Sequence, residues 1–172
     1  EGPTVFVSAA VHGAAVIGVE IVRRLAKHPS VRRTKGTPLP VPIVHMPWFI
    51  GHSRYLPDRR DLNRSFPGSA TGSLASQLAN LFLTEVVLKC DFGLDLHSAA
   101  VHRTNLPQLR VNANDAKAME LAKVFGPPLI LKSPLRRNSF RQAAADKGVP
   151  VLLHEAGAAL SVDAASRRVG AP

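Results

Sequence analysis

The chain has 172 residues, of which 45% are hydrophobic and 20% are charged, as expected for one soluble globular domain with a hydrophobic core. Its 22 Lys and Arg against 12 Asp and Glu give a formal net charge of +10, but the basic residues are scattered in pairs, and few aromatic side chains accompany them to stack on bases. We therefore predict no nucleic-acid partner and, instead, a small anionic ligand.

Cysteine usage and hydropathy bear on the compartment. The single cysteine, Cys90, excludes an intrachain disulfide and favours a reducing compartment. No signal-peptide pattern opens the chain, and no apolar run approaches the roughly 18 residues of a membrane span. These features predict a cytoplasmic protein with no membrane partner. The chain length predicts a single domain over residues 1–172.

Short apolar runs rich in β-branched residues alternate with segments of helical periodicity. The predicted strands are residues 4–10, 41–46, 92–96, 129–132 and 149–153. The predicted helices are residues 16–28, 73–89, 115–125 and 139–147. This alternation predicts an α/β fold in layers, with helices on both sides of a largely parallel sheet.

The helix at residues 73–89 and the segment before it, residues 47–72, allow more detailed predictions. In the helix at residues 73–89, Ser73 is the expected N-cap, and the expected apolar stripe consists of Leu74, Leu78, Leu81, Phe82, Val86 and Leu88. Residues 47–72 show little periodicity and are predicted to form one long irregular loop. Loops of that length in compact domains are usually functional or disordered.

Polar side chains stand at the carboxyl ends of three predicted strands: His12 after the first, Asp95 and His97 at another, and Glu155 after the last. Parallel strands present these ends at one edge of the sheet, where α/β folds bind ligands. A single histidine there is more often structural, so the prediction depends on the convergence. Imidazoles are natural zinc ligands, and a carboxylate that does not bind the metal can serve as general base. Asp95 and His97 lie two apart and share a face, so Asp95 can orient a neighbouring ligand.

The long loop supplies a second candidate site. Asn63 and Arg64 place an amide beside a planar guanidinium, a pair suited to bidentate binding of a carboxylate. Pro67 and Gly68 then turn the chain. The alternative for this segment is an Asx-type turn with a solvated arginine.

Four motifs together resemble those of the succinylglutamate desuccinylase/aspartoacylase family. They are Val11-His12-Gly13, the segment Arg54 to Gly68 with Asp61-Leu62-Asn63-Arg64 at its centre, Asp95-Leu96-His97-Ser98, and Glu155-Ala156-Gly157. The resemblance covers nearly all of the chain. It implies a three-layer, zinc-carboxypeptidase-like fold with a mixed sheet. It also implies a zinc-dependent hydrolase that cleaves the amide bond of an N-acyl amino acid or a similar carboxylate-bearing amide.

The same resemblance implies roles around a metal. His12 and His97 would bind one zinc ion, and Glu155 would act as general base and proton shuttle. Asp61 would hold a ligand histidine from behind, a role that the strand spacing independently suggests for Asp95.

It also implies roles around the substrate. Asn63 and Arg64 would bind the substrate carboxylate. Arg54 would polarise the scissile carbonyl and stabilise the oxyanion.

The sequence departs from the family at the first motif. The family motif reads His-Gly-Asp-Glu and its Glu is a zinc ligand, whereas this chain has Ala14 and Ala15 at the two acidic positions. A methyl group cannot bind a metal, and two histidines with water hold zinc more weakly than three protein ligands. Ala158 also stands where relatives often carry Glu. The alternative function is therefore a catalytically impaired relative that binds carboxylates without hydrolysis. The family's C-terminal β-rich segment is expected to be absent or not covered.

Overall fold

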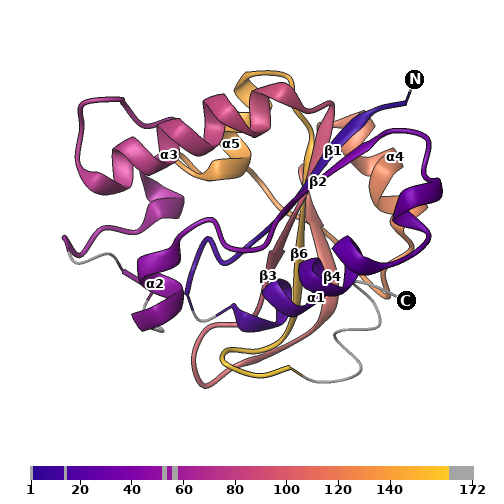
Figure 1. The fold of residues 1–172 in the computed structure, drawn as a ribbon, viewed down its shortest axis with the longest axis horizontal. Coiled ribbons are helices and arrows are strands. Elements are labelled where there is room, and N and C mark those ends of the chain that lie inside the picture. The colour runs from indigo at the N-terminus through magenta and orange to yellow at the C-terminus, as the bar shows by residue number, and fades with distance from the viewer. Residues whose placement is uncertain (1, 14, 52–53, 56–57, 163–172) are drawn as a thin grey trace.

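The computed structural model describes residues 2–13, 15–51, 54–55 and 58–162 (Figure 1). Within these residues one sheet contains β1 (Thr4–Ala9), β2 (Thr37–Val41), β3 (Phe92–His97), β4 (Thr104–Val111), β5 (Ile130–Lys132) and β6 (Val151–Ala158). The strand order is β2-β1-β3-β6-β4-β5, and β4 runs antiparallel to β6 while the other neighbours are parallel. The predicted mixed, mostly parallel sheet is confirmed.

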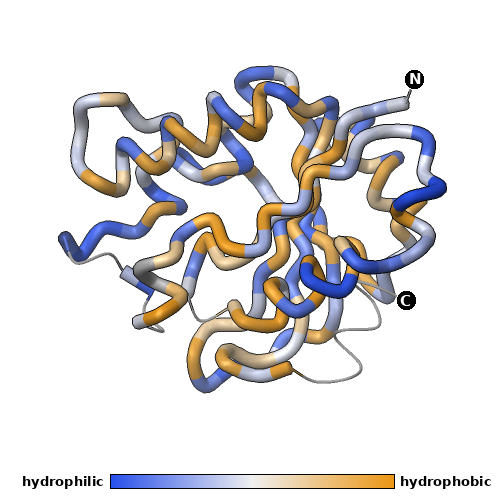
Figure 2. Tube along the Cα trace, in the orientation of Figure 1, coloured by the Kyte–Doolittle hydropathy of each residue, from blue (hydrophilic) through white to orange (hydrophobic). Residues whose placement is uncertain are grey.

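Helices cover both faces of the sheet, which gives three layers (Figure 1). The helices are α1 (Val16–Lys27), α2 (Met46–Gly51), α3 (Leu74–Glu85), α4 (Ala116–Phe125) and α5 (Phe140–Asp146). On one face Phe6 packs with Phe82 of α3 and Phe140 of α5. On the other face Val7 packs against α1, and Leu152 packs against α4. Figure 2 shows hydrophobic residues running through the central strands, as a sheet buried on both faces requires.

Helix α3 begins as predicted, but its buried face is only partly the predicted one. Ser73 is the N-cap and its side chain accepts a hydrogen bond from Ser76 N. Three members of the predicted stripe lie towards solvent: Leu74, Leu81 and Leu88 are 53%, 57% and 43% exposed. The buried residues of α3 are Ala75, Ala79, Phe82 and Leu83. The small alanines let the helix approach the sheet closely. The ring of Phe82 packs against those of Phe6 and Phe140, and this contact, rather than the leucine stripe, orients the helix.

The strand predicted at residues 41–46 is wrong. The strand is β2, which ends where that prediction began. Helix α2 starts at Met46, the last residue of the predicted strand, and continues into the predicted long loop at residues 47–72. Strand β2 was not predicted because it contains two prolines, Pro38 and Pro40, which are unusual within strands. They are tolerated because β2 is an edge strand. Thr37 N points towards β1 and donates to Pro3 O. Backbone nitrogens alternate in direction along a strand, so those of Pro38 and Pro40 lie on the open side, where no hydrogen bond to the sheet is lost.

Strands β4 and β6 also differ from expectation. No strand was predicted over β4, because Pro107 and a register shift between Asn105 and Gln108 interrupt its pattern. Strand β6 is longer than predicted, so Glu155 lies within the strand.

Helix α1 lies close to the sheet. A Cβ atom on Gly18 would be 2.9 Å from the Cβ atoms of both Ala9 and Leu96, so glycine permits this approach. In the described part of the chain, no helix has the length and apolar character that crossing a membrane requires.

Candidate active site

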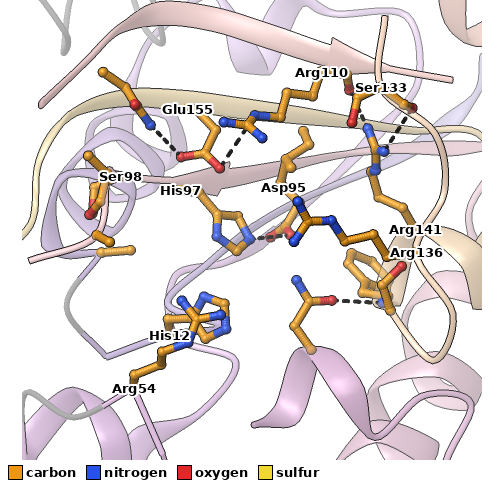
Figure 3. A pocket seen from close by; sticks show the side chains of 18 of the residues that line it. His12, Arg54, Asp95, His97, Ser98, Arg110, Ser133, Arg136, Arg141 and Glu155 are labelled. Carbon is orange, nitrogen blue, oxygen red and sulfur yellow. Dashed lines mark hydrogen bonds and ion pairs between the residues drawn. The ribbon is translucent and has the colours of Figure 1, made fainter. Parts of the chain in front are cut away.

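The polar residues at the carboxyl edge of the sheet open onto one cavity of about 300 Å³ (Figure 3). Seven of the residues that the sequence suggested for the site line this cavity: His12, Arg54, Asn63, Arg64, Asp95, His97 and Glu155. Asp61 stands behind the wall, where it contacts His12 and Arg54. Residues distant in sequence are therefore gathered at one place, as the strand-end argument predicts.

His12 is placed by a sharp turn at the end of β1. Ala10 is buried and adopts the left-handed conformation (φ 54°), and His12 O accepts a hydrogen bond from Ala15 N (3.1 Å), at the start of α1. His12 Nε2 lies 2.9 Å from Asp61 Oδ1. Since a carboxylate only accepts, the hydrogen is on Nε2. Burial lowers the pKa of His12 below its ordinary value, so the neutral ring predominates near pH 7.

Asp61 connects the histidine to the long loop. It caps the 3-10 turn Leu62–Arg64 by accepting from Asn63 N (2.8 Å), and Arg54 Nη2 donates to its Oδ2 (2.8 Å). Burial alone would raise the pKa of Asp61, but His12 and Arg54 hold it well below the ordinary value. Asp61 thus remains a carboxylate that fixes both His12 and Arg54 at the cavity.

His97 is held in the same way from its own strand. Its Nε2 lies 2.7 Å from Asp95 Oδ2, and Ser8 Oγ of the neighbouring strand donates to Asp95 Oδ1 (2.9 Å). Burial would lower the pKa of His97, but the charges of Asp95 and Glu155 outweigh burial and raise it. The rings of His12 and His97 meet edge to face, with their centroids 5.3 Å apart.

These two histidines meet part of the requirement for a metal site. Each has Nε2 bound to a carboxylate, the arrangement that orients metal-bound histidines, so Nδ1 is the atom that would coordinate. Among the described residues, however, no group of three or more metal-ligating side chains is found. Ala15 lines the cavity beside His12 and carries no ligand atom. Ala14 lies outside the described residues. The donors described fit two of the three protein ligands of a catalytic zinc site.

Asn63 and Arg64 present hydrogen-bond donors. Asn63 Oδ1 accepts from Phe140 N (2.8 Å) at the start of α5, so its amide nitrogen is the group left for a ligand. Arg64 is exposed, and its Nη1 donates to Asn63 O. A pair that offers only donors suits an anion.

Arginines dominate the charge of the cavity. The arginines lining it are Arg54, Arg64, Arg103, Arg110, Arg136 and Arg141, against two acidic residues, Asp95 and Glu155. Arg141 is buried and donates to the backbone oxygens of Arg110, Ser133 and Pro134, so it builds the wall. An anionic ligand fits this excess of positive charge.

Sequence reasoning missed Asn105, Arg110 and Arg141. Asn105 Nδ2 donates to Glu155 Oε2 (2.9 Å), and Arg110 Nε lies 3.8 Å from Glu155 Oε1 (Figure 3). The available signal is that residues 102–110 are polar and basic and follow the third motif, which is compatible with a pocket segment but does not specify these contacts.

The mixed sheet, with its polar residues gathered at the carboxyl edge, defines a carboxypeptidase-like α/β protein. The chain belongs to the succinylglutamate desuccinylase/aspartoacylase family, because residues 1–171 match the catalytic domain of that family. The resemblance drawn from the four motifs is thus confirmed.

Individual relatives agree with this assignment. The N-alpha-acetyl-L-2,4-diaminobutyric acid deacetylase of Halomonas elongata is 31% identical over an alignment of 134 residues, which covers 74% of this chain and 39% of the deacetylase. The succinylglutamate desuccinylase/aspartoacylase structure from Rhodobacter sphaeroides has a TM-score of 0.87 and 27% identity, and covers 99% of this chain and 53% of that one. The product-bound ectoine utilization protein EutE (DoeB) from Ruegeria pomeroyi has a TM-score of 0.88 and 26% identity, with coverages of 98% and 54%. The chain therefore spans about half or less of the length of these relatives.

Proposed function

We propose that the protein hydrolyses the amide bond of an N-acyl amino acid or a similar carboxylate-bearing amide, with one zinc ion at His12 and His97. One observation carries the proposal. His12 and His97 are each hydrogen-bonded to a carboxylate, and their ring centroids lie 5.3 Å apart. They share a cavity with Glu155 and with Arg54 and Arg64 of the long loop. The names of the deacetylase and desuccinylase relatives support the same reaction class.

Each chain residue then has a defined task. Zinc, when bound, would supply Lewis-acid activation of water and of the scissile carbonyl. Glu155 takes a proton from the attacking water and returns it to the leaving amine. Arg54, fixed by Asp61, donates to the carbonyl oxygen as negative charge develops there. Asn63 and Arg64 donate to the substrate carboxylate.

The test is release of free amine from N-acetyl and N-succinyl amino acids. Glu155→Gln should lower kcat by at least about 100-fold, because the proton acceptor is lost while shape is kept. Glu120→Gln, on the exposed side of α4, is the matched control and should retain full activity. Turnover that survives Glu155→Gln would show that Glu155 is not the base.

A second candidate function is carboxylate binding without hydrolysis, and Ala15 is the observation that favours it. Ala15 is 3% exposed in the wall beside His12 and lies where the family has a ligand Glu. Zinc content after dialysis separates the two functions. About one equivalent of zinc with chelator-sensitive turnover supports the hydrolase, and neither zinc nor turnover, with N-acyl amino acids still raising Tm, supports the binder.

Ala15 can be tested directly. Ala15→Glu should raise zinc affinity by roughly 10-fold or more by adding a third protein ligand, whereas Ala15→Gln, of the same length but uncharged, should raise it less. The measurement is zinc titration calorimetry, which needs no turnover. Equal affinities of wild type and Ala15→Glu would show that position 15 does not reach the metal.

A further inference from the structure

We propose that Asn105 is a positioning residue for Glu155, and that a one-residue bulge in β4 is what brings it there. The inference rests on the proposed function, in which Glu155 is the base. It adds a residue and a backbone feature to that site.

The contact joins two strands across the antiparallel pair. Asn105 Nδ2 donates to Glu155 Oε2 at 2.9 Å, and the Glu155 side chain is only 15% exposed. Arg110 approaches the other oxygen, with Nε 3.8 Å from Oε1; this Nε is buried and has no hydrogen-bond partner among the described residues. Figure 3 shows the guanidinium of Arg110 approaching the carboxylate of Glu155. Asn105 therefore makes the direct hydrogen bond, and Arg110 adds charge.

A regular strand would not allow this arrangement. Asn105 and Arg110 are five residues apart, and residues at an odd spacing on a regular strand point to opposite faces. Here Asn105 pairs with Gly157, whereas Gln108 pairs with Glu155, so β4 advances three residues while β6 advances two. The extra residue restores Asn105 and Arg110 to the same face, the face that carries Glu155.

The chemistry of the cavity gives this hydrogen bond a purpose. Glu155 shares the cavity with several arginines, including Arg54 and Arg136, and an unheld carboxylate on a flexible side chain would turn towards the nearest guanidinium. A neutral amide donor fixes the orientation without adding another positive charge. Asn105 thus holds Oε2 of Glu155 while Oε1 faces Arg110, which fixes the carboxylate in one orientation at the cavity.

Steady-state kinetics test the proposal. Asn105→Leu should lower kcat by roughly 10- to 100-fold, the usual effect of removing a supporting hydrogen bond at a site, with KM within about twofold. Asn105→Gln, which retains an amide donor, should recover part of kcat. Thr104→Val, at the exposed neighbouring position, is the control and should behave as wild type. Unchanged kcat in Asn105→Leu, or equal losses in the Leu and Gln variants, would overturn the proposal.

A second measurement separates this inference from the proposed function. In protein labelled with 13C at the glutamate carboxylates, the resonance that Glu155→Gln removes belongs to Glu155. It should move in Asn105→Leu, move less in Asn105→Gln, and stay in place in Thr104→Val, whether or not the protein turns over substrate. A wild type without turnover contradicts the hydrolase function, whereas a resonance that does not move in Asn105→Leu contradicts the positioning role.

Discussion

Glu155 and His154 are neighbours on β6 whose side chains meet opposite surroundings. Glu155 faces the polar cavity, whereas His154 is fully buried on the other face and packs against Phe125, with ring centroids 5.9 Å apart. Among the described residues neither ring nitrogen of His154 has a hydrogen-bond partner. Burial, with a smaller contribution from the charge of His97, lowers the pKa of His154 to about 4. The ring is therefore neutral in the folded protein at physiological pH.

His154 should make stability pH-dependent. Its pKa is about 4 when folded against a model value of 6.5, so the unfolded chain binds a proton first as pH falls, and stability declines from pH 6.5 down to 4. The loss should reach about 3 kcal/mol. Urea unfolding at pH 7 and at pH 4.5 measures it. In His154→Leu this part of the pH dependence should vanish, and an unchanged difference between the two pH values would exclude His154 as its source.

Arg64 should govern affinity for the carboxylate. Arg64→Gln should weaken binding of N-acyl amino acids by about 1.5–3 kcal/mol, the range for a hydrogen bond to a charged group, and raise KM accordingly. The matching neutral amide, which lacks the carboxylate, should bind both forms equally. Calorimetry with the two ligands measures the difference, and equal weakening of both would argue against a carboxylate contact.

The sequence indicated many residues of the candidate site because they occupy special positions. His12, Asp95, His97 and Glu155 stand at or near strand ends, where topology alone brings them together. Asn105 could not be inferred, since its contact depends on a bulge that reverses side-chain alternation.

Among the elements, α3 offers a direct comparison of neighbouring residues. Phe82 is 5% exposed and contacts the rings of Phe6 and Phe140, whereas Leu81 is 57% exposed. Phe82→Ala should therefore cost about 3–5 kcal/mol. Leu81→Ala should change stability by no more than about 0.5 kcal/mol. Chemical denaturation of both variants provides the measurement, and similar losses would mean that the helix is rotated from the orientation described.

Helix limits were predictable to a few residues because their caps are local in sequence. Helices α3, α4 and α5 each begin at a side-chain cap that accepts a hydrogen bond from the first turn: Ser73, Asp115 and Ser139, respectively. Helix α4 ends at Gly126, which adopts the left-handed conformation. Strands β2 and β4 were missed because both contain prolines, whose tolerance depends on the neighbouring strand.

Across the whole molecule, the order of the sheet sets a gradient of local stability. Strand β3 pairs with β1 and β6, whereas β2 and β5 pair on one side. Amide hydrogen exchange should be slowest in β3 and fastest in β2 and β5, because edge strands open with fewer contacts. Mass spectrometry of exchanging peptides tests this order, and slow exchange in β5 would contradict it.

The net charge of +10 also has a partial structural account. Six arginines line the cavity, so part of the basic excess lies where the proposed anionic substrate would bind. Zinc, the absence of a nucleic-acid partner and the cytoplasmic location remain predictions.

The prolines of β2 have a further consequence for solubility. An open sheet edge presents unpaired N–H and C=O groups that invite a strand from another molecule. Pro38 and Pro40 remove two of those donors on the outward side of β2. A neighbouring molecule therefore cannot extend the sheet at this edge with a regular ladder, and the protein is guarded there against edge-to-edge aggregation.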